Sequence, residues 1–448
     1  MTATRPSHEA LLGQALELAA KGGADSADAV LLEGTSLSAS CRLGNPEDLE
    51  RSEGQDMGLR VFMGQQQASV SSSDISQSAI AKLVERALAM ARAVPEDPYC
   101  GLADQTRLAS NWRDLDLVDE IEPDACELLD MAREAEDAAR AVDGVTNSEG
   151  GTAGYGMTRA LLATSHGFVG GYAATRHSVS ASVLAGTGTE MERDYDYSST
   201  CHKADLDAAT DIGRRAGERT VRRLGPSKIS SGQVPIVYDP RASGGLLRHL
   251  SGAISGSAIA RGTSYLMDSL DKAVFSPAVT IVDDPHRVRG LRSRPFDGEG
   301  VATEPREIIA GGVLTTWLLD SRAARQLGSQ TTGHASRGTS GPPSPAPTNL
   351  YMQAGTVSPD ELMADIATGF YVTELIGMGV NGVTGDYSRG ASGFMIENGK
   401  LGEPVSEVTI AGNLKDMFLG LTPADDLVFR YGIDAPTVRV DGMTVAGQ

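Results

Sequence analysis

The first candidate for a catalytic site is the pair His8-Glu9 near the start of the chain. A zinc-binding helix of this kind needs a second histidine one turn later, so that both imidazoles face one metal ion and the glutamate activates its water. The positions one turn on are Leu12 and Gly13. No second imidazole can therefore reach a metal beside His8, and we interpret the pair as the start of a surface helix.

A glycine pattern, G-x-G-x-x-G, runs from Gly377 to Gly382, and Glu397 follows. In a dinucleotide-binding fold this pattern opens a helix whose N-terminus holds the pyrophosphate. Further glycines interrupt the next segment, at positions 382, 385, 390 and 393. Each would cost a helix roughly 1 kcal/mol relative to alanine. We therefore predict turns in a β-rich region rather than a cofactor site.

Two further patterns could suggest a hydrolytic site. Asp283-Asp284-Pro285-His286 combines carboxylates with an imidazole, but it follows the strand-like residues 279–282 and is typical of a polar turn. Ser255 and Ser388 lie among glycines, yet both miss the G-x-S-x-G spacing of a hydrolase nucleophile. The residues by themselves identify no active site.

Charge and cysteine content exclude several classes of protein. Lys and Arg number 39 against 59 Asp and Glu, a net charge of −20 over 448 residues. This balance argues against binding to nucleic acid or to an anionic membrane, which relies on cations that neutralise phosphates. No stretch resembles a signal peptide or a membrane span, which predicts a cytoplasmic protein with reduced thiols. The four cysteines form no C-x-x-C site: Cys41, Cys100, Cys126 and Cys201.

Apolar periodicity predicts helices and strands in alternation through the first half of the chain. Ser7 is the expected N-cap of the first helix, and Asp74 or Ser76 that of the second. Helices are predicted at residues 8–21, 76–94, 127–142 and 206–224. Strands are predicted at residues 29–32, 36–43, 58–63, 67–71, 160–164 and 179–184.

Breaker residues at 225–232 predict a domain boundary. We expect an α+β domain over residues 1–225, with helices packed on a mixed or antiparallel sheet; a second break near residues 100–120 remains an alternative. A mostly β domain follows over residues 233–448. A strand at 233–238, hairpins at 307–317 and 394–401, and a short helix at 413–421 belong to it.

One long loop stands out in the second half. Residues 330–348 contain four prolines and three glycines and supply no regular hydrogen-bonding pattern. Loops of this length in compact domains tend to be functional. We predict that it is mobile or forms part of an interface or chamber wall.

Several segments, in their order and spacing, resemble the TldD/PmbA family, and specifically its PmbA (TldE) branch. The resemblance runs from about residue 28 to residue 447. It rests on residues 58–64, 95–98, 244–252, 276–284, 296–300, 348–352, 384–393, 410–415 and 443–447.

The resemblance implies a metallopeptidase complex that cuts small or unfolded peptides in the bacterial cytoplasm. Its TldD branch carries H-E-x-x-x-H on a helix and a metal-binding cysteine near the C-terminus; the PmbA branch pairs with it and lacks these ligands. Here Arg248, His249 and Ala253 stand at the three helix positions, and no cysteine follows Cys201. A shift of one residue still leaves only one ligand.

These expectations favour a non-catalytic subunit that pairs with a TldD-like metallopeptidase in a heterodimer or higher assembly. They place zinc on the partner, with no catalytic residue, metal or cofactor on this chain, and allow a homodimer when the chain is isolated. His249 would be a helix residue at a domain interface or a substrate contact. The alternatives are a regulatory protein of the gyrase-modulator kind and a stand-alone peptidase with an unrecognised site.

Overall fold

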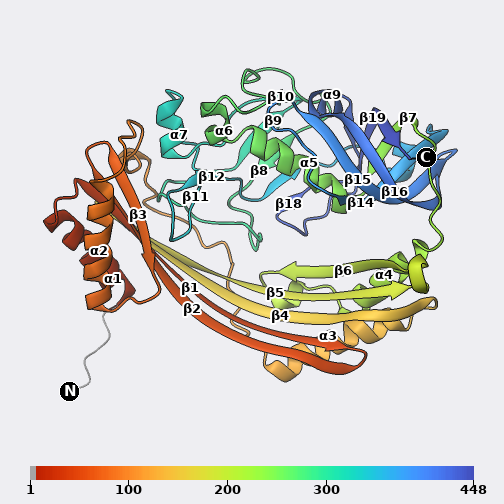
Figure 1. Ribbon diagram of the computed structural model, residues 1–448, viewed down its shortest axis with the longest axis horizontal. Coiled ribbons are helices and arrows are strands. Elements are labelled where there is room, and N and C mark those ends of the chain that lie inside the picture. Colours follow the sequence, from red (N-terminus) through yellow and green to blue (C-terminus); the bar gives the residue numbers. More distant parts are fainter. Residues whose placement is uncertain (1–6, 448) are drawn as a thin grey trace.

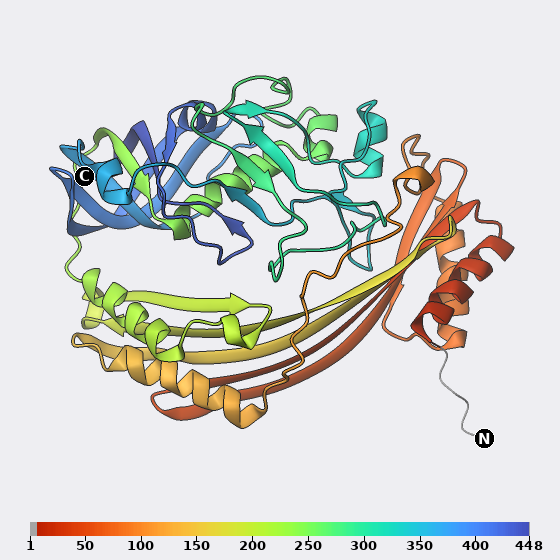
Figure 2. The same cartoon turned by 180° about the vertical axis from the view of Figure 1, so that it is seen from behind.

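A long, curved antiparallel sheet forms one side of the molecule, and a β-rich C-terminal part lies over its concave face (Figures 1 and 2). The computed structural model describes residues 7–447. Helices pack on sheets throughout, which confirms the predicted α+β class. No helix in these residues is long and apolar enough to cross a membrane.

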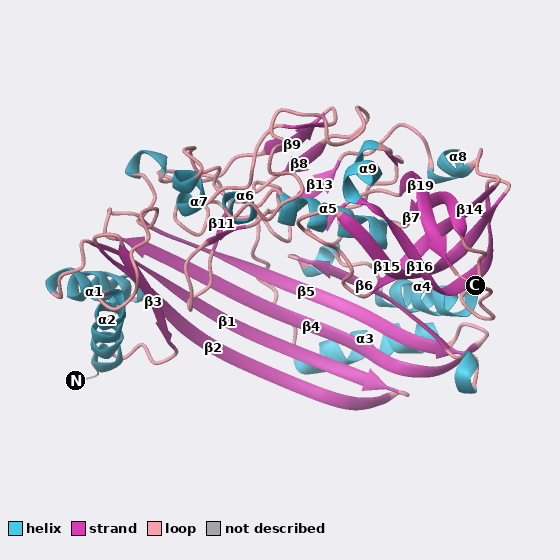
Figure 3. Cartoon of the chain, turned by 45° about the horizontal axis from the view of Figure 1, so that its top comes forward, coloured by secondary structure: helices cyan, strands magenta, loops and turns pink. Residues whose placement is uncertain are grey.

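The first sheet has six strands in the order β3-β2-β1-β4-β5-β6, and every neighbouring pair is antiparallel. Several strands run most of its length (Figure 3). Their bounds are β1 (Ser26–Arg42), β2 (Asn45–Met63), β3 (Gln66–Ser72), β4 (Val145–Thr164), β5 (Val169–Ala185) and β6 (Glu192–Thr200).

The prediction of two strands at 29–32 and 36–43 is wrong, because β1 is continuous across both. Glu33 and Thr35 break the apolar alternation on the outer face, where they line a cavity of about 700 Å³ instead of packing under a helix. The strands predicted at 160–164 and 179–184 are likewise only parts of β4 and β5. An uncovered stretch of sheet has no apolar face to reveal it in the sequence.

Two helix pairs cover the two ends of the outer face, and all four helices match predicted ones (Figure 2). Ser7 and Ser76 cap the first two, as expected. The pair α1–α2 packs on β1, β2 and β3, and the pair α3–α4 packs on β1, β4 and β5. Their bounds are α1 (His8–Lys21), α2 (Gln77–Ala91), α3 (Ala125–Arg140) and α4 (Ala209–Arg222).

The C-terminal part contains a closed barrel, because β16 pairs with both β15 and β19. Asn398 and Gly399 have φ values of 49° and 77° in the β15–β16 turn, which confirms that hairpin. The barrel strands are β7 (Gly232–Tyr238), β14 (Thr368–Ile376), β15 (Asp386–Glu397), β16 (Lys400–Asn413) and β19 (Val438–Ala446). Beside β19 lies β17 (Leu421–Pro423).

A smaller sheet, in the order β10-β9-β8-β13-β18, packs beside the barrel. Its strands are β8 (Ile281–Asp283), β9 (Arg306–Ala310), β10 (Val313–Leu314), β13 (Leu350–Met352) and β18 (Ile433–Asp434). The remaining helices are α5 (Pro240–Ala253), α6 (Gly256–Ala260), α7 (Ser321–Gln326), α8 (Pro359–Met363) and α9 (Leu414–Leu419).

The 330–348 loop is fastened at both ends by one buried carboxylate. Asp283 accepts a hydrogen bond from the backbone N–H of Thr348 at 2.7 Å, and its other oxygen lies 3.2 Å from Nε2 of His334. Within the loop, β11 (Ala335–Ser336) pairs with β12 (Ser344–Pro345). These contacts hold both ends of the loop in place, and its role in an interface or a chamber wall of the assembly stays a prediction.

The tip of this loop joins the C-terminal part to the first sheet. Nη1 of Arg337 lies 2.5 Å from the carboxylate of Asp28 on β1, and the hydroxyl of Thr339 donates to Asp56 on β2. A methyl group at Gly58 would lie 2.2 Å from the carbonyl oxygen of Thr339. The two parts therefore meet through a polar, close-fitting contact.

We predict that Asp320, the N-cap of α7 near this contact, makes the stability of the folded chain depend on pH. Burial raises the pKa of Asp320 to about 6; the N–H of Ala323 opposes this and Glu299 adds to it. The folded chain therefore holds a proton that the unfolded chain releases near pH 3.8, and its free energy of unfolding falls as the pH rises from about 4 to 6. Asp320→Asn keeps the cap but cannot ionise. Its free energy of unfolding, relative to that of the wild type, should therefore rise by about 2 kcal/mol when the pH is raised from 4.5 to 7.5.

Urea unfolding at both pH values measures this gain. Asp124→Asn is the matched control, because Asp124 also caps a helix but is exposed to water. An equal gain in the control would contradict the assignment to Asp320.

Candidate functional site

The helix α5 carries the three residues that stand at the metal-helix positions implied by the family resemblance. Asp239 caps it by accepting from the N–H of Arg241, and Pro240 occupies the first turn. Its apolar face packs into the C-terminal core. Arg248 is exposed, His249 is half-buried and Ala253 is buried in the core, with 5% of its surface exposed.

His249 faces cations and an aromatic ring rather than other metal-binding groups. Its ring meets that of Tyr387 on β15 edge-on, with centroids 6.0 Å apart. Burial lowers the pKa of His249, and the charges of Arg389 and Arg248 lower it further. The imidazole is therefore neutral near pH 7 and lies in positive surroundings.

These residues do not fit a zinc ion. A catalytic zinc needs three protein ligands and an open position for water, and His249 is the only donor of the three. Across residues 7–447, no group of three His, Cys, Asp or Glu side chains is placed to hold a metal. The thiol of Cys201 is also unsuited, because burial raises its pKa to about 11.

The other sequence candidates lie apart from α5 and have structural roles. His8 lies 3.3 Å from Glu33 on the outer face of the first sheet. The 377–382 glycine segment is the connection between β14 and β15, as predicted. Asp284 accepts from the N–H of His286 in a polar turn, again as predicted, whereas Asp283 anchors the 330–348 loop.

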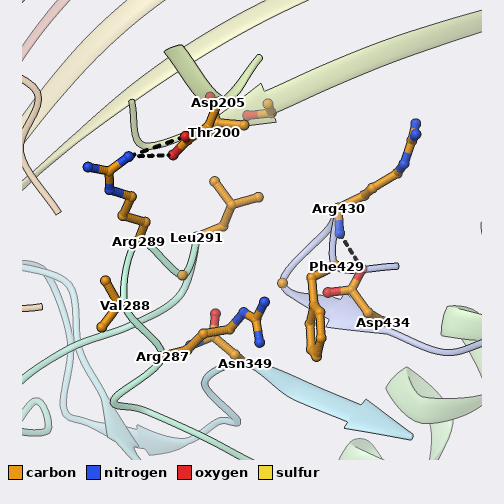
Figure 4. Close-up of a pocket in the computed structure, with 13 residues that line it drawn as sticks. Thr200, Asp205, Arg287, Val288, Arg289, Leu291, Asn349, Phe429, Arg430 and Asp434 are labelled. Atoms are coloured by element: carbon orange, nitrogen blue, oxygen red, sulfur yellow. Dashed lines mark hydrogen bonds and ion pairs between the residues drawn. The ribbon is translucent and has the colours of Figure 1, made fainter. Parts of the chain in front are cut away.

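Two cavities open between the concave face of the first sheet and the C-terminal part. The cavity in Figure 4, about 320 Å³, lies between the end of β6 and residues 287–291 and 429–434. Arg289 turns toward Asp205 there, at 3.0 Å, while the Arg287 guanidinium lies over the Phe429 ring, 3.3 Å from its centroid. The second cavity, about 630 Å³, lies on the inner face of β1, β2, β4 and β5; we call it the sheet cavity.

Sequence reasoning missed the arginines that surround these cavities. A signal was present, because residues 287–294 hold four arginines within eight positions of a chain with a net charge of −20. The run has no helix or strand periodicity, so the sequence does not indicate which part of the fold it faces. Its position above the inner face of the first sheet appears only in the fold.

Comparison with protein-family models gives three matches along the chain. Residues 27–91 match domain 1 of the PmbA/TldA metallopeptidases, residues 119–224 match their central domain, and residues 231–447 match their C-terminal domain.

Full-length relatives agree with these matches. The chain is 40% identical to "Metalloprotease PmbA" of Escherichia coli O157:H7, over 100% of this chain and 97% of the relative. It is 38% identical to "Metalloprotease PmbA homolog" of Haemophilus influenzae, over 97% and 94%. A "Metalloprotease TldD homolog" of Haemophilus influenzae matches at 28% over 53% of each chain.

Solved structures show the same fold. A "putative modulator of DNA gyrase" from Bacteroides thetaiotaomicron superposes with a TM-score of 0.90 at 29% identity, over 98% of this chain and 99% of that one. TldE from Thermococcus kodakarensis superposes with a TM-score of 0.84 at 19% identity, over 98% and 100%. Because the family models cover most of the chain and full-length relatives are named PmbA, the chain belongs to the PmbA/TldD metallopeptidase family, in its PmbA (TldE) branch.

Proposed function

We propose that this chain is the non-catalytic subunit of a cytoplasmic metallopeptidase assembly that acts on small or unfolded peptides. The observation that carries the proposal is the composition of α5. Where the TldD branch has its H-E-x-x-x-H ligands, this helix presents Arg248, His249 and Ala253. Two ligands and the general base are absent, and proton transfer by such a base typically contributes 10²–10⁴-fold to a rate.

The electrostatics of α5 support the same conclusion. Arg248 and Arg389 lie close enough to His249 to lower its pKa. The same two positive charges would repel a divalent cation placed at that imidazole. The chain therefore contributes part of the wall of the assembly, while the metal-dependent step takes place on the partner subunit.

The metal-bearing subunit is a TldD-like partner that carries zinc. The matches include both a PmbA homolog and a TldD homolog from Haemophilus influenzae, so one organism contains members of both branches. In this proposal, the chain and its TldD-like partner form a heterodimer or a higher assembly, and the proposal allows a homodimer when the chain is isolated.

Peptide hydrolysis with elemental analysis tests the proposal. The purified chain is expected to hold no stoichiometric zinc and to cleave no peptide, and activity should appear when a partner with H-E-x-x-x-H is added. The variant Arg248→His/His249→Glu/Ala253→His should stay inactive alone, because the sequence has no cysteine after Cys201 to supply the third ligand and position 253 is in the core. Zinc-bound, chelator-sensitive cleavage by the wild-type chain alone would overturn the proposal.

A regulatory role is the second candidate, favoured by the name of the solved relative from Bacteroides thetaiotaomicron, "putative modulator of DNA gyrase". A pull-down from the native cell, analysed by mass spectrometry, separates the two. Recovery of a TldD-like chain supports the peptidase assembly. Recovery of gyrase subunits without it supports regulation.

A further inference from the structure

Five arginines in or beside the walls of the sheet cavity and the cavity of Figure 4 have no ion-pair partner among the described residues. Arg176 lines the sheet cavity, Arg287 lines the cavity of Figure 4, and Arg292 follows Leu291, which lines both. Across residues 7–447, none of the five has a carboxylate oxygen within ion-pair distance, although many other arginines of the chain do. The five are Arg176 on β5, Arg248 on α5, and Arg287, Arg292 and Arg294 on the segment between β8 and β9. We call them the cleft arginines.

The cleft arginines lie near one another across the gap between the two parts. Nη2 of Arg176 lies 3.4 Å from the carbonyl oxygen of Leu291, next to Arg292. Burial lowers the pKa of Arg292, and the charges of Arg294, Arg248 and Arg176 lower it further, with Asp283 opposing. Like charges that repel one another without a counter-ion are costly, and an anionic ligand would remove that cost.

We call the space between the concave face of the first sheet and the C-terminal part, with its two cavities, the cleft. The carboxylates nearest to it already bind other groups. Asp283 is bound by the ends of the 330–348 loop, and Asp205 is paired with Arg289. Asp434 accepts hydrogen bonds from the backbone N–H groups of Arg430 and Tyr431. Asp434, Asp283 and Asp297 lie near Arg287, Arg292 and Arg294, but within residues 7–447 none of these carboxylates comes within ion-pair distance of a cleft arginine.

The inner face of the first sheet leaves room beneath them for a polypeptide backbone. The sheet cavity measures about 630 Å³, and apart from Arg176 its lining is uncharged and mostly small. Ser36 and Ser52 offer hydroxyl groups. Glycines on three adjacent strands keep the surface low: Gly34, Gly54 and Gly156.

We propose that this cleft binds an acidic segment of an extended peptide, with Arg176, Arg248 and Arg292 contacting its Asp and Glu carboxylates. The inference rests on the proposed function, because it names the peptide class that the assembly receives. A nucleic acid is disfavoured, since a net charge of −20 repels a polyanion at long range. A short acidic peptide carries few charges and needs only the local field of the cleft.

Fluorescence anisotropy with the isolated full-length chain tests this inference. The probes are a dye-labelled peptide of alternating Glu and Ser, the same peptide with Lys in place of Glu, and a single-stranded oligonucleotide of equal length. The Glu peptide should bind, and its affinity should fall with added salt. The Lys peptide and the oligonucleotide should bind more weakly.

The variant Arg176→Gln/Arg248→Gln/Arg292→Gln should lose about tenfold or more in affinity for the Glu peptide, the loss expected when two or more charge-assisted hydrogen bonds disappear. The matched control is Arg86→Gln/Arg159→Gln/Arg261→Gln, which makes the same change in net charge outside the cleft. Arg159 is the closest match, since it lies on the outer face of β4 and forms no ion pair within residues 7–447. Thermal unfolding of both variants establishes that each is folded.

Equal loss in the two variants, no binding of the Glu peptide, or tighter binding of the oligonucleotide or of the Lys peptide would each overturn the inference. Because the partner is absent, the result is independent of catalysis. Charge-selective binding without any partner-dependent hydrolysis would refute only the proposed function. Hydrolysis without charge-selective binding would refute only this inference.

Discussion

Replacing Asp28 with asparagine is expected to destabilise the folded chain by about 3–5 kcal/mol, the cost of leaving a buried charge unpaired. Asp28 is 1% exposed and faces two buried guanidinium groups, those of Arg60 and Arg337. Burial opposes ionisation of Asp28, but Arg337 and Arg60 outweigh it and hold the pKa below its usual value. Asparagine has the same shape but no charge, so both guanidinium groups would lose their carboxylate.

Arg337 depends on Asp28 most. Nε and Nη2 of Arg337 are buried and have no hydrogen-bond partner in the part of the chain that is described. Arg60 keeps a second carboxylate within reach, because Glu299 lies 3.8 Å away. The loss should therefore appear first as release of the 330–348 loop from the first sheet.

Urea unfolding of Asp28→Asn measures the loss, and limited proteolysis of residues 336–341 reports release of the loop. Asp48→Asn is the control, because Asp48 is exposed on β2 and its charge is solvated. A loss below about 1 kcal/mol, within the range of ordinary surface ion pairs, would mean that the buried pair contributes little to stability.

Gly58→Ala is expected to destabilise the chain by about 2–3 kcal/mol, as overpacking at a tightly fitted contact does. The added methyl would meet the backbone of Thr339, 2.2 Å from its oxygen and 2.7 Å from its Cα. Backbone atoms cannot rotate away as the end of a flexible side chain can. The loop tip must move, which also separates Thr339 from Asp56 and Arg337 from Asp28.

Gly54→Ala is the matched control for Gly58→Ala. Gly54 lies four residues earlier on β2, on the same inner face, and a methyl there would meet nothing within 4 Å. Alanine in a strand loses less conformational freedom on folding than glycine, so Gly54→Ala should be neutral or stabilising by roughly 0.5–1 kcal/mol. If both variants unfold at the same urea concentration, the close contact with Thr339 is not present in solution.

Local patterns in the sequence were sufficient for the four helices of the first half, the hairpin turn and the family. Ser7 and Ser76 begin the first two helices because a serine hydroxyl satisfies a free N–H at a helix start, a contact between residues three positions apart. Asn398-Gly399 forms its turn because both residues tolerate positive φ. Such features depend on neighbours in the sequence and can be read there.

Features that depend on distant residues came only from the tertiary structure. The continuity of β1 was hidden because Glu33 and Thr35 occupy a stretch of outer face that no helix covers. The cleft arginines were hidden for a similar reason, since Arg176 and Arg292 are separated by more than a hundred positions. They come near each other only when the C-terminal part lies over the sheet and Arg176 bonds Leu291. At α5 the missing metal ligands can be read from the sequence, because ligand identity is a property of single residues. The fold determines three other features: the positive surroundings of His249, the buried position of Ala253, and the ion pair between Arg337 and Asp28. Burial and electrostatic fields arise from all the groups that packing brings together, so they cannot be read from single residues.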